Sequence, residues 1–264
     1  MNFGLVIVGD EILSGKRQDK HLPKAIELLA ARGLALAWAR YVGDERERIT
    51  PVLRDAFACG DAVFCCGGIG ATPDDHTRQC AAAALGVPLE LHPHARDLIV
   101  ERMRDAAREQ GLPFEPERAD NLHRLNMGVF PRGAQLIPNP YNKIPGFSVG
   151  DVHFMPGFPV MAHPMIEWLL DTRYAGLHGA HRRVERSLIV TGSMEATLTP
   201  LMERIESNFP GLKVFSLPSV DHPVHGRHIE LGVKGDAAAT EAAFAELKAG
   251  LRALGARLGA ELVR

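Results

Sequence analysis

The chain has 264 residues, 46% of them hydrophobic and 23% charged, so it can bury a core of ordinary globular composition. Its net charge of −2 provides no overall attraction to nucleic acid or to an anionic membrane surface. The longest purely apolar runs, such as 5–8, are too short for a signal peptide or a membrane span. Neither a nucleic acid nor a membrane is therefore expected as a partner. The four cysteines form no CxxC pair, and we expect them to be buried thiols in a reducing cytoplasm.

Strand-like and helix-like segments alternate along the first third of the chain. Continuous apolar runs predict buried strands, and apolar residues at helical spacing predict helices. The strands are predicted over 2–9, 34–42 and 61–68, and the helices over 19–33, 44–60 and 72–86. This order predicts a parallel sheet with right-handed crossovers, and ligands of such sheets bind beyond the carboxyl ends of the strands.

The remaining segments predict the end of this unit and then a smaller one. A helical region with a break, a hairpin with Gly150–Asp151 at its turn and a closing helix are expected over 93–127, 147–155 and 160–173. A composition shift at 174–183 indicates a linker. The second unit is predicted as β-α-β-β-α, over 184–192, 194–209, 212–219, 227–235 and 236–258. We therefore expect two domains, residues 1–175 and 183–264.

A glycine-rich stretch, "CCGGIGATPDDHT", follows the third predicted strand. Gly67, Gly68 and Gly70 allow positive φ angles and close approach of a ligand to the backbone. A helix predicted directly afterwards would add free amides and the positive end of its dipole, which favours an anion. The alternative is a tight strand-to-helix turn that binds nothing.

Two aspartates follow the glycines, and local structure explains only one of them. Thr72 suits the N-cap of the predicted helix, and Asp75 falls at the capping-box position three residues later. Asp74 has no such explanation. Two adjacent carboxylates at the mouth of an anion-binding loop therefore need another account.

Further carboxylates occur at the ends of the first two predicted strands. Asp10 and Glu11 lie in "GDEILSG", and Asp44 lies in "VGDERE", where it is either a helix N-cap or a residue facing the ligand. Carboxylates gathered beside a phosphate would repel it, and a divalent cation such as Mg²⁺ resolves that conflict. Lys143, in the rigid loop 139–147, is either a further phosphate ligand or a solvated loop lysine.

Together, the stretches "GDEILSG", "VGDERE", "GGIGATPDDHT", "NP…PGF" and "MPGFP" resemble the molybdopterin-binding domain of the MoaB/Mog and MoeA type. Their order and spacing are most similar to the amino-terminal domain of the CinA (competence/damage-inducible protein A) family, over roughly residues 2–173. The resemblance implies an α/β fold, a three-layer α-β-α domain with a mostly parallel sheet. It also implies a small α+β domain after it.

The resemblance also implies roles for individual residues. Asp44 and Asp75 would be catalytic and, with Asp10, would hold a divalent metal such as Mg²⁺, with K⁺ as a further candidate ion. The phosphate or nucleotide would be bound by Gly67, Gly68, Gly70, Thr72, Asp10, Glu11, Lys143, Pro156 and Gly157. Related proteins are commonly dimers or trimers, so a homo-oligomer is expected.

The activity that the resemblance favours is metal-dependent hydrolysis of an ADP-ribose- or FAD-type pyrophosphate. The alternatives are adenylyl transfer to molybdopterin or a related nucleotide, and non-catalytic binding of such a ligand. Lys143 and the pair Lys16–Arg17 make this sequence more basic than many relatives near the pocket, which bears on the choice of substrate. The sequence includes no counterpart of the nicotinamide-mononucleotide deamidase domain of longer members, so that activity is not carried over.

Overall fold

The computed structural model describes residues 1–179 and 183–263 and forms two compact units, residues 1–178 and 179–264. These limits lie within a few residues of the predicted domains, 1–175 and 183–264. Part of the predicted linker, 180–182, lies outside the described residues. In the described part of the chain, no helix is long and apolar enough to cross a membrane.

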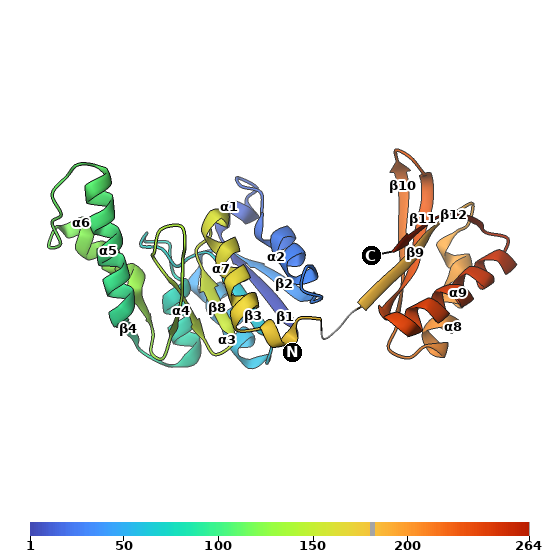
Figure 1. Cartoon of the computed structure of the whole chain (residues 1–264), viewed down its shortest axis with the longest axis horizontal. Helices are drawn as coiled ribbons and strands as arrows, with labels where there is room; N and C mark the ends of the chain where they lie inside the picture. The colour runs from blue at the N-terminus through green and yellow to red at the C-terminus, as the bar shows by residue number, and fades with distance from the viewer. Residues whose placement is uncertain (180–182, 264) are drawn as a thin grey trace. The chain divides into compact units, whose positions relative to one another are not determined.

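The first unit is built on a six-stranded, mostly parallel sheet (Figure 1). In spatial order its strands are β2 (Leu36–Val42), β1 (Phe3–Val8), β3 (Ala62–Cys66), β8 (Val152–Met155), β7 (Gly146–Val149) and β6 (Gln135–Ile137). The first four strands pair in parallel, and β8, β7 and β6 pair antiparallel. The predicted hairpin is present as β7 and β8, which turn at Gly150 and Asp151.

Helices cover both faces of this sheet because β1 buries both sets of its alternating side chains. Phe3, Leu5 and Ile7 pack in one core with α2 (His21–Ala30) and α7 (Pro159–Thr172). Val6 and Val8 pack in a second core with α3 (Arg46–Ala58) and α4 (Thr77–Leu85). This arrangement confirms the predicted three-layer α/β class, and it brings the carboxyl ends of β1, β2 and β3 to one edge.

Shorter elements complete the first unit. They are α1 (Asp10–Leu13), β4 (Leu89–Leu91), α5 (Pro93–Glu109), α6 (Ala119–Arg124), β5 (Val129–Pro131) and the 3₁₀ turns η1 (Leu125–Gly128) and η2 (Ala175–Leu177). β4 and β5 pair as a two-stranded sheet. Sequence patterns did not predict β4, β5 or β6, because a three-residue strand is too short to display an alternating period.

The start of α4 corrects one prediction. The helix begins at Thr77 and not at residue 72, and His76 takes the N-cap position. Residues 72–75 instead form a turn, in which the Asp75 amide donates to the Thr72 carbonyl over 3.1 Å. The Thr77 amide donates to the carbonyl of Gly68 over 2.9 Å, so the glycine loop itself determines where the helix starts. Thr72 as N-cap and Asp75 as a capping-box residue were therefore wrong.

The second unit is an antiparallel sheet packed against two helices (Figure 1). Its strands, in spatial order, are β10 (Lys213–His222), β11 (Gly226–Asp236), β9 (Arg183–Thr191) and β12 (Arg257–Val263), and its helices are α8 (Glu195–Asn208) and α9 (Ala237–Ala253). The predicted final helix over 236–258 was too long. Gly255, at φ +72°, follows the end of α9 and allows the chain to turn back as β12, which the sequence analysis missed.

Candidate functional site

The glycine loop after β3 adopts a conformation that requires glycine at two positions. Gly67 has φ +111°, and a Cβ there would lie 2.1 Å from the carbonyl oxygen of Val8. Gly68 has φ +67°, and a Cβ there would lie 2.2 Å from the Thr77 Oγ1. The loop therefore packs directly against the end of β1 and the first turn of α4.

Four carbonyl groups of this loop accept hydrogen bonds from the protein, and its first amide, that of Gly67, donates to the Met155 carbonyl over 3.0 Å. The Thr77 hydroxyl and amide donate to the carbonyls of Gly67 and Gly68, over 3.0 Å and 2.9 Å. The carbonyls of Gly70 and Ala71 accept from Arg78 and His123. Within residues 1–179 and 183–263, the amides of 68–70 donate to no protein acceptor. Successive free amides of this kind are able to bind an anion.

Asp10 and Asp44 are joined by two reciprocal hydrogen bonds, each from the backbone amide of one residue to the carboxylate of the other. Asp10 is the first residue of α1, two residues after β1, and Asp44 follows β2. The Asp10 amide donates to the Asp44 Oδ2 over 2.9 Å, and the Asp44 amide donates to the Asp10 Oδ1 over 3.3 Å. The alternative that Asp44 is a helix N-cap was wrong, because Glu45 occupies that position. Gly43 permits the contact, since a Cβ there would lie 2.5 Å from the Asp10 Oδ1.

Carboxylates surround this pair. The pKa of Asp44 is raised, first by burial and then by the charges of neighbouring carboxylates, while the hydrogen bond from the Asp10 amide lowers it. The neighbours whose charges raise it are Asp10, Glu11 and Asp74. We call Asp10, Glu11, Asp44 and Asp74 the acid group. The prediction that carboxylates from separate strand ends gather at one edge is consistent with this arrangement.

Asp74 and Asp75 interact with different neighbouring residues. The negative charge of Asp74 raises the pKa of the Asp44 carboxyl. The Asp75 carboxylate accepts hydrogen bonds from the amide of Thr72, over 2.8 Å, and from its hydroxyl. The negative charge of Asp75 raises the pKa of Arg78, against the larger effect of burial, which lowers it. The Asp75 carboxylate also lies against the glycine loop, since a Cβ on Gly70 would be 2.5 Å from the Asp75 Oδ2. The catalytic and metal-binding roles of Asp75 stay predictions.

The "MPGFP" loop after β8 borders the glycine loop. A Cβ on Gly157 would lie 3.4 Å from the Gly67 Cα, so the two loops pack backbone to backbone. The Gly157 carbonyl contacts the His21 Nε2 over 3.0 Å, which ties this loop to the start of α2. His21 is buried and was missed in the sequence, where nothing set it apart from other polar helix residues.

Lys143 lies in a different environment from the one expected of a phosphate ligand. Its Nζ is 2.6 Å from the Glu101 Oε1 and 2.7 Å from the Asp105 Oδ2, both on α5. Two carboxylates therefore already neutralise its charge. A phosphate-binding role for Lys143 stays a prediction, and we build no part of the site on it.

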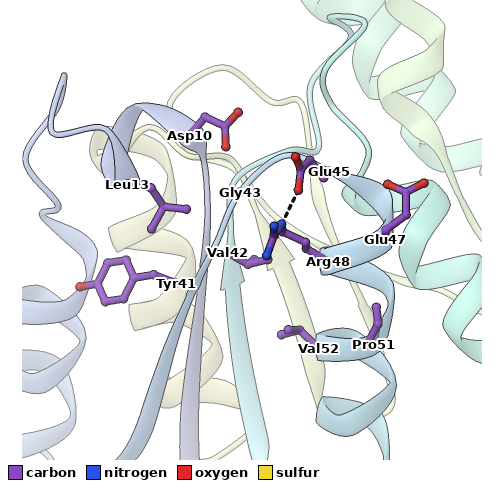
Figure 2. Close-up of a pocket in the computed structure, with 10 residues that line it drawn as sticks. All are labelled: Asp10, Leu13, Tyr41, Val42, Gly43, Glu45, Glu47, Arg48, Pro51 and Val52. Atoms are coloured by element: carbon purple, nitrogen blue, oxygen red, sulfur yellow. Dashed lines mark hydrogen bonds and ion pairs between the residues drawn. The ribbon is translucent and has the colours of Figure 1, made fainter.

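A cavity of about 600 Å³ opens beside the acid group (Figure 2). Figure 2 shows Asp10 at its rim, Leu13 and Tyr41 along one wall, and the Arg48–Glu45 ion pair on the opposite wall. The apolar wall and the charged rim together suit a flat organic group attached to an anion. A second cavity, of about 470 Å³, is lined by Thr72, Asp75 and Arg78 among others.

The residues present fit a metal that enters with a phosphorylated ligand. Among the described residues, no three His, Cys, Asp or Glu side chains are placed to hold an ion on their own. Asp10 and Asp44 nevertheless bring two carboxylates together at the loop. Mg²⁺ commonly takes one or two carboxylates and completes its shell with substrate phosphate and water. A metal bound by protein ligands alone does not fit this arrangement.

The fold and the loop define the first unit as an α/β domain with a candidate anion site at the carboxyl ends of its parallel strands. Residues 4–175 match the model of the family described as a probable molybdopterin binding domain, and the chain belongs to that family. The resemblance recognised in the sequence is thereby confirmed.

Individual relatives agree with this membership. A CinA-like protein of Anaeromyxobacter dehalogenans is 34% identical over 175 residues, which cover 64% of this chain and 40% of that protein. A CinA-like protein of Citrifermentans bemidjiense is 33% identical over 210 residues, covering 77% of this chain and 47% of that protein. The chain thus matches less than half the length of these two relatives.

A solved structure agrees with the fold. The CinA protein of Thermoplasma acidophilum, whose function is described as unknown, is 26% identical to this chain with a TM-score of 0.53. The match covers 65% of this chain and 98% of that protein.

Proposed function

We propose that this chain binds a phosphorylated pterin of the molybdopterin type at the carboxyl ends of β1, β2 and β3, together with a divalent cation. The observation that supports this proposal is the pairing of free loop amides at 68–70 with the acid group at the same sheet edge. The description of the family supports the pterin as the ligand.

Different residues of the chain would bind the phosphate, the cation and the ring system of the ligand. The amides of 68–70 would donate to phosphate oxygens, and Gly157 would hold the loop by packing on Gly67. Asp10 and Asp44 would hold the cation. When bound, the cation supplies positive charge between the carboxylates and the phosphate, which would otherwise repel each other. The apolar wall at Leu13 and Tyr41 would accept the flat ring system.

Binding is the function that these observations support best. Hydrolysis of an ADP-ribose- or FAD-type pyrophosphate and adenylyl transfer stay predictions from the resemblance, as do K⁺ and a dimeric or trimeric assembly. The binding experiment can be extended to both reactions, since ADP-ribose, FAD and ATP belong in the same panel of ligands and their products can be separated by chromatography.

The test is a thermal-unfolding screen of the full chain against molybdopterin, ADP-ribose, FAD and ATP, each with Mg²⁺, with Mn²⁺ or with EDTA. A ligand present at 100 times its Kd should stabilise the fold by about 2.7 kcal/mol. We expect molybdopterin to stabilise the chain in the presence of a divalent cation and to lose most of that effect in EDTA. Stabilisation by none of the ligands under any condition would overturn the proposal.

Matched variants locate the site. Asp44→Asn keeps an oxygen that can accept the Asp10 amide but removes one charge from the acid group, so it should abolish the metal-dependent part of the stabilisation. Asp97→Asn removes a charge from an exposed site on α5, beside Arg96, and should change nothing. Equal behaviour of the two variants would place the ligand elsewhere.

A further inference from the structure

The second cavity, of about 470 Å³, is lined in part by the turn and the start of α4 that follow the glycine loop, and donors and cations are numerous among its lining residues. We call it the arginine pocket and define it by six of its lining residues. They are Arg46, Thr72, Asp75, His76, Arg78 and His123. Asp75 is the single carboxylate among the residues that line it. Its composition is therefore opposite to that of the acid group.

Arg78 is a buried cation that forms no ion pair with any described residue. Its side chain projects from the first turn of α4 and is only 4% exposed. Its Nη1 donates to the carbonyl of Asn126, and its Nη2 to that of Gly70. In the described part of the chain no carboxylate lies within ion-pair distance of it. A guanidinium stays charged at any physiological pH, and a buried charge without a counter-ion is unfavourable.

Two residues that line this pocket each carry a buried polar atom without a partner among the described residues. The Arg78 Nε and the His76 Nδ1 are both buried and make no hydrogen bond among the described residues. Buried donors and acceptors in folded proteins are nearly always satisfied, so orphaned atoms beside a cavity point to a group that enters it. Arg46, the first residue of α3, adds an exposed guanidinium at the same cavity.

We propose that the arginine pocket binds a phosphate group of the ligand, separate from the anion held at the acid group. Two guanidinium groups and an imidazole provide more donors than a carboxylate's two oxygens can accept, whereas a phosphate accepts several bonds and pairs bidentately with arginine. The proposal rests on the proposed function, because Thr72 and Asp75 belong to the same turn as Asp74. The ligand would then carry anionic groups at two places, and the turn 72–75 would direct one carboxylate towards each.

The experiment is calorimetric titration of inorganic phosphate into the full chain in EDTA, so that no metal contributes. We expect saturable binding by the wild type and a loss of affinity of about tenfold or more in Arg46→Gln, the effect of removing one charge-assisted hydrogen bond. Arg54→Gln is the matched control, because Arg54 is exposed on the same helix and does not line the pocket. It should change the affinity by less than about twofold.

Further variants separate this proposal from the proposed function. Asp44→Asn should not weaken phosphate binding in EDTA, because it removes a carboxylate that would repel phosphate, although it should abolish metal-dependent pterin binding. Arg78→Lys should weaken phosphate binding, and circular dichroism will show whether it folds; if it does not, Arg46→Gln decides alone. Absence of phosphate binding by the wild type, or equal affinities for Arg46→Gln and Arg54→Gln, would overturn the arginine pocket and leave the acid group's function untouched.

Discussion

Gly68→Ala tests whether the glycine loop is held by its packing against α4. Gly68 and Gly86 have nearly the same φ, +67° and +68°, but their surroundings differ. A Cβ on Gly68 would lie 2.2 Å from the Thr77 Oγ1, whereas a Cβ on Gly86 would have nothing within 4 Å. Gly86→Ala therefore isolates the left-handed backbone term, which destabilises the fold by about 1–2 kcal/mol.

Gly68→Ala adds two further terms to the same backbone effect. Thr77 is fully buried, so it cannot swing away from the new methyl group freely. The overlap should destabilise the fold by about 1–3 kcal/mol, and the loss of the bond from Thr77 to the Gly67 carbonyl by about 1 kcal/mol. We expect Gly68→Ala to be about 2–4 kcal/mol less stable than Gly86→Ala.

Urea unfolding of both variants, followed by circular dichroism, measures this difference. The m-values should stay equal, so that the shift in midpoint reports stability alone. Equal unfolding free energies for the two variants would refute the reasoning, because they would show that the loop yields to an added methyl group. The loop would then be too soft to present its amides in a fixed arrangement.

Three further outcomes follow from the electrostatics. The pKa of Asp44 is raised in the folded chain, so its ionised form destabilises the fold at neutral pH. At pH 7, Asp44→Asn should therefore be more stable than the wild type by up to about 1 kcal/mol. This difference should vanish as the pH falls through the raised pKa. Burial lowers the pKa of His153 from 6.5 to about 3, so between these pH values the unfolded chain binds a proton that the folded chain does not. The unfolding free energy should therefore fall by up to about 1.4 kcal/mol for each unit by which the pH is lowered from 6.5 towards 3. Urea titrations should show that His153→Gln removes this contribution to the slope. Asp75→Ala should destabilise the fold by about 1 kcal/mol more than Asp74→Ala, because the Asp75 carboxylate accepts from both the amide and the hydroxyl of Thr72, whereas from Thr72 only the side chain hydrogen-bonds to Asp74, which lowers the pKa of Asp74. Equal values would contradict the assignment.

The long elements of the first unit could be predicted because each carries a strong period. The apolar run at 2–9 is buried on both faces, as expected of a central parallel strand, and it became β1. The start of α4 could not be predicted, since Thr72–Asp75 satisfies every local signal for a helix start. A contact with a distant part of the loop, from the Thr77 amide to the Gly68 carbonyl, overrides those signals.

The site was predictable to the extent that it depends on strand ends. Asp10 and Asp44 follow strands that are neighbours in the sheet, so their proximity follows from the topology. The separation of Asp74 from Asp75 depends on the geometry of one turn, which no period in the sequence encodes. Arg78 was missed because an arginine in a first helical turn is normally solvated, and its burial arises from packing against η1 and the loop.

Asp74 and Asp75 are adjacent in the sequence, but each lies in different surroundings beside the candidate anion-binding loop. Asp74 adds its negative charge to the acid group, where burial first, and then the charges of neighbouring carboxylates, raise the pKa of Asp44. Asp75 lies beside Arg78, a buried positive charge that no ion pair compensates in the described part of the chain. Each imbalance makes the folded state less stable than it would be with a counter-charge in place. A ligand that brings a cation to the acid group and a phosphate to the arginine pocket would neutralise both charge imbalances. Removing these two unfavourable terms would make its binding free energy more favourable.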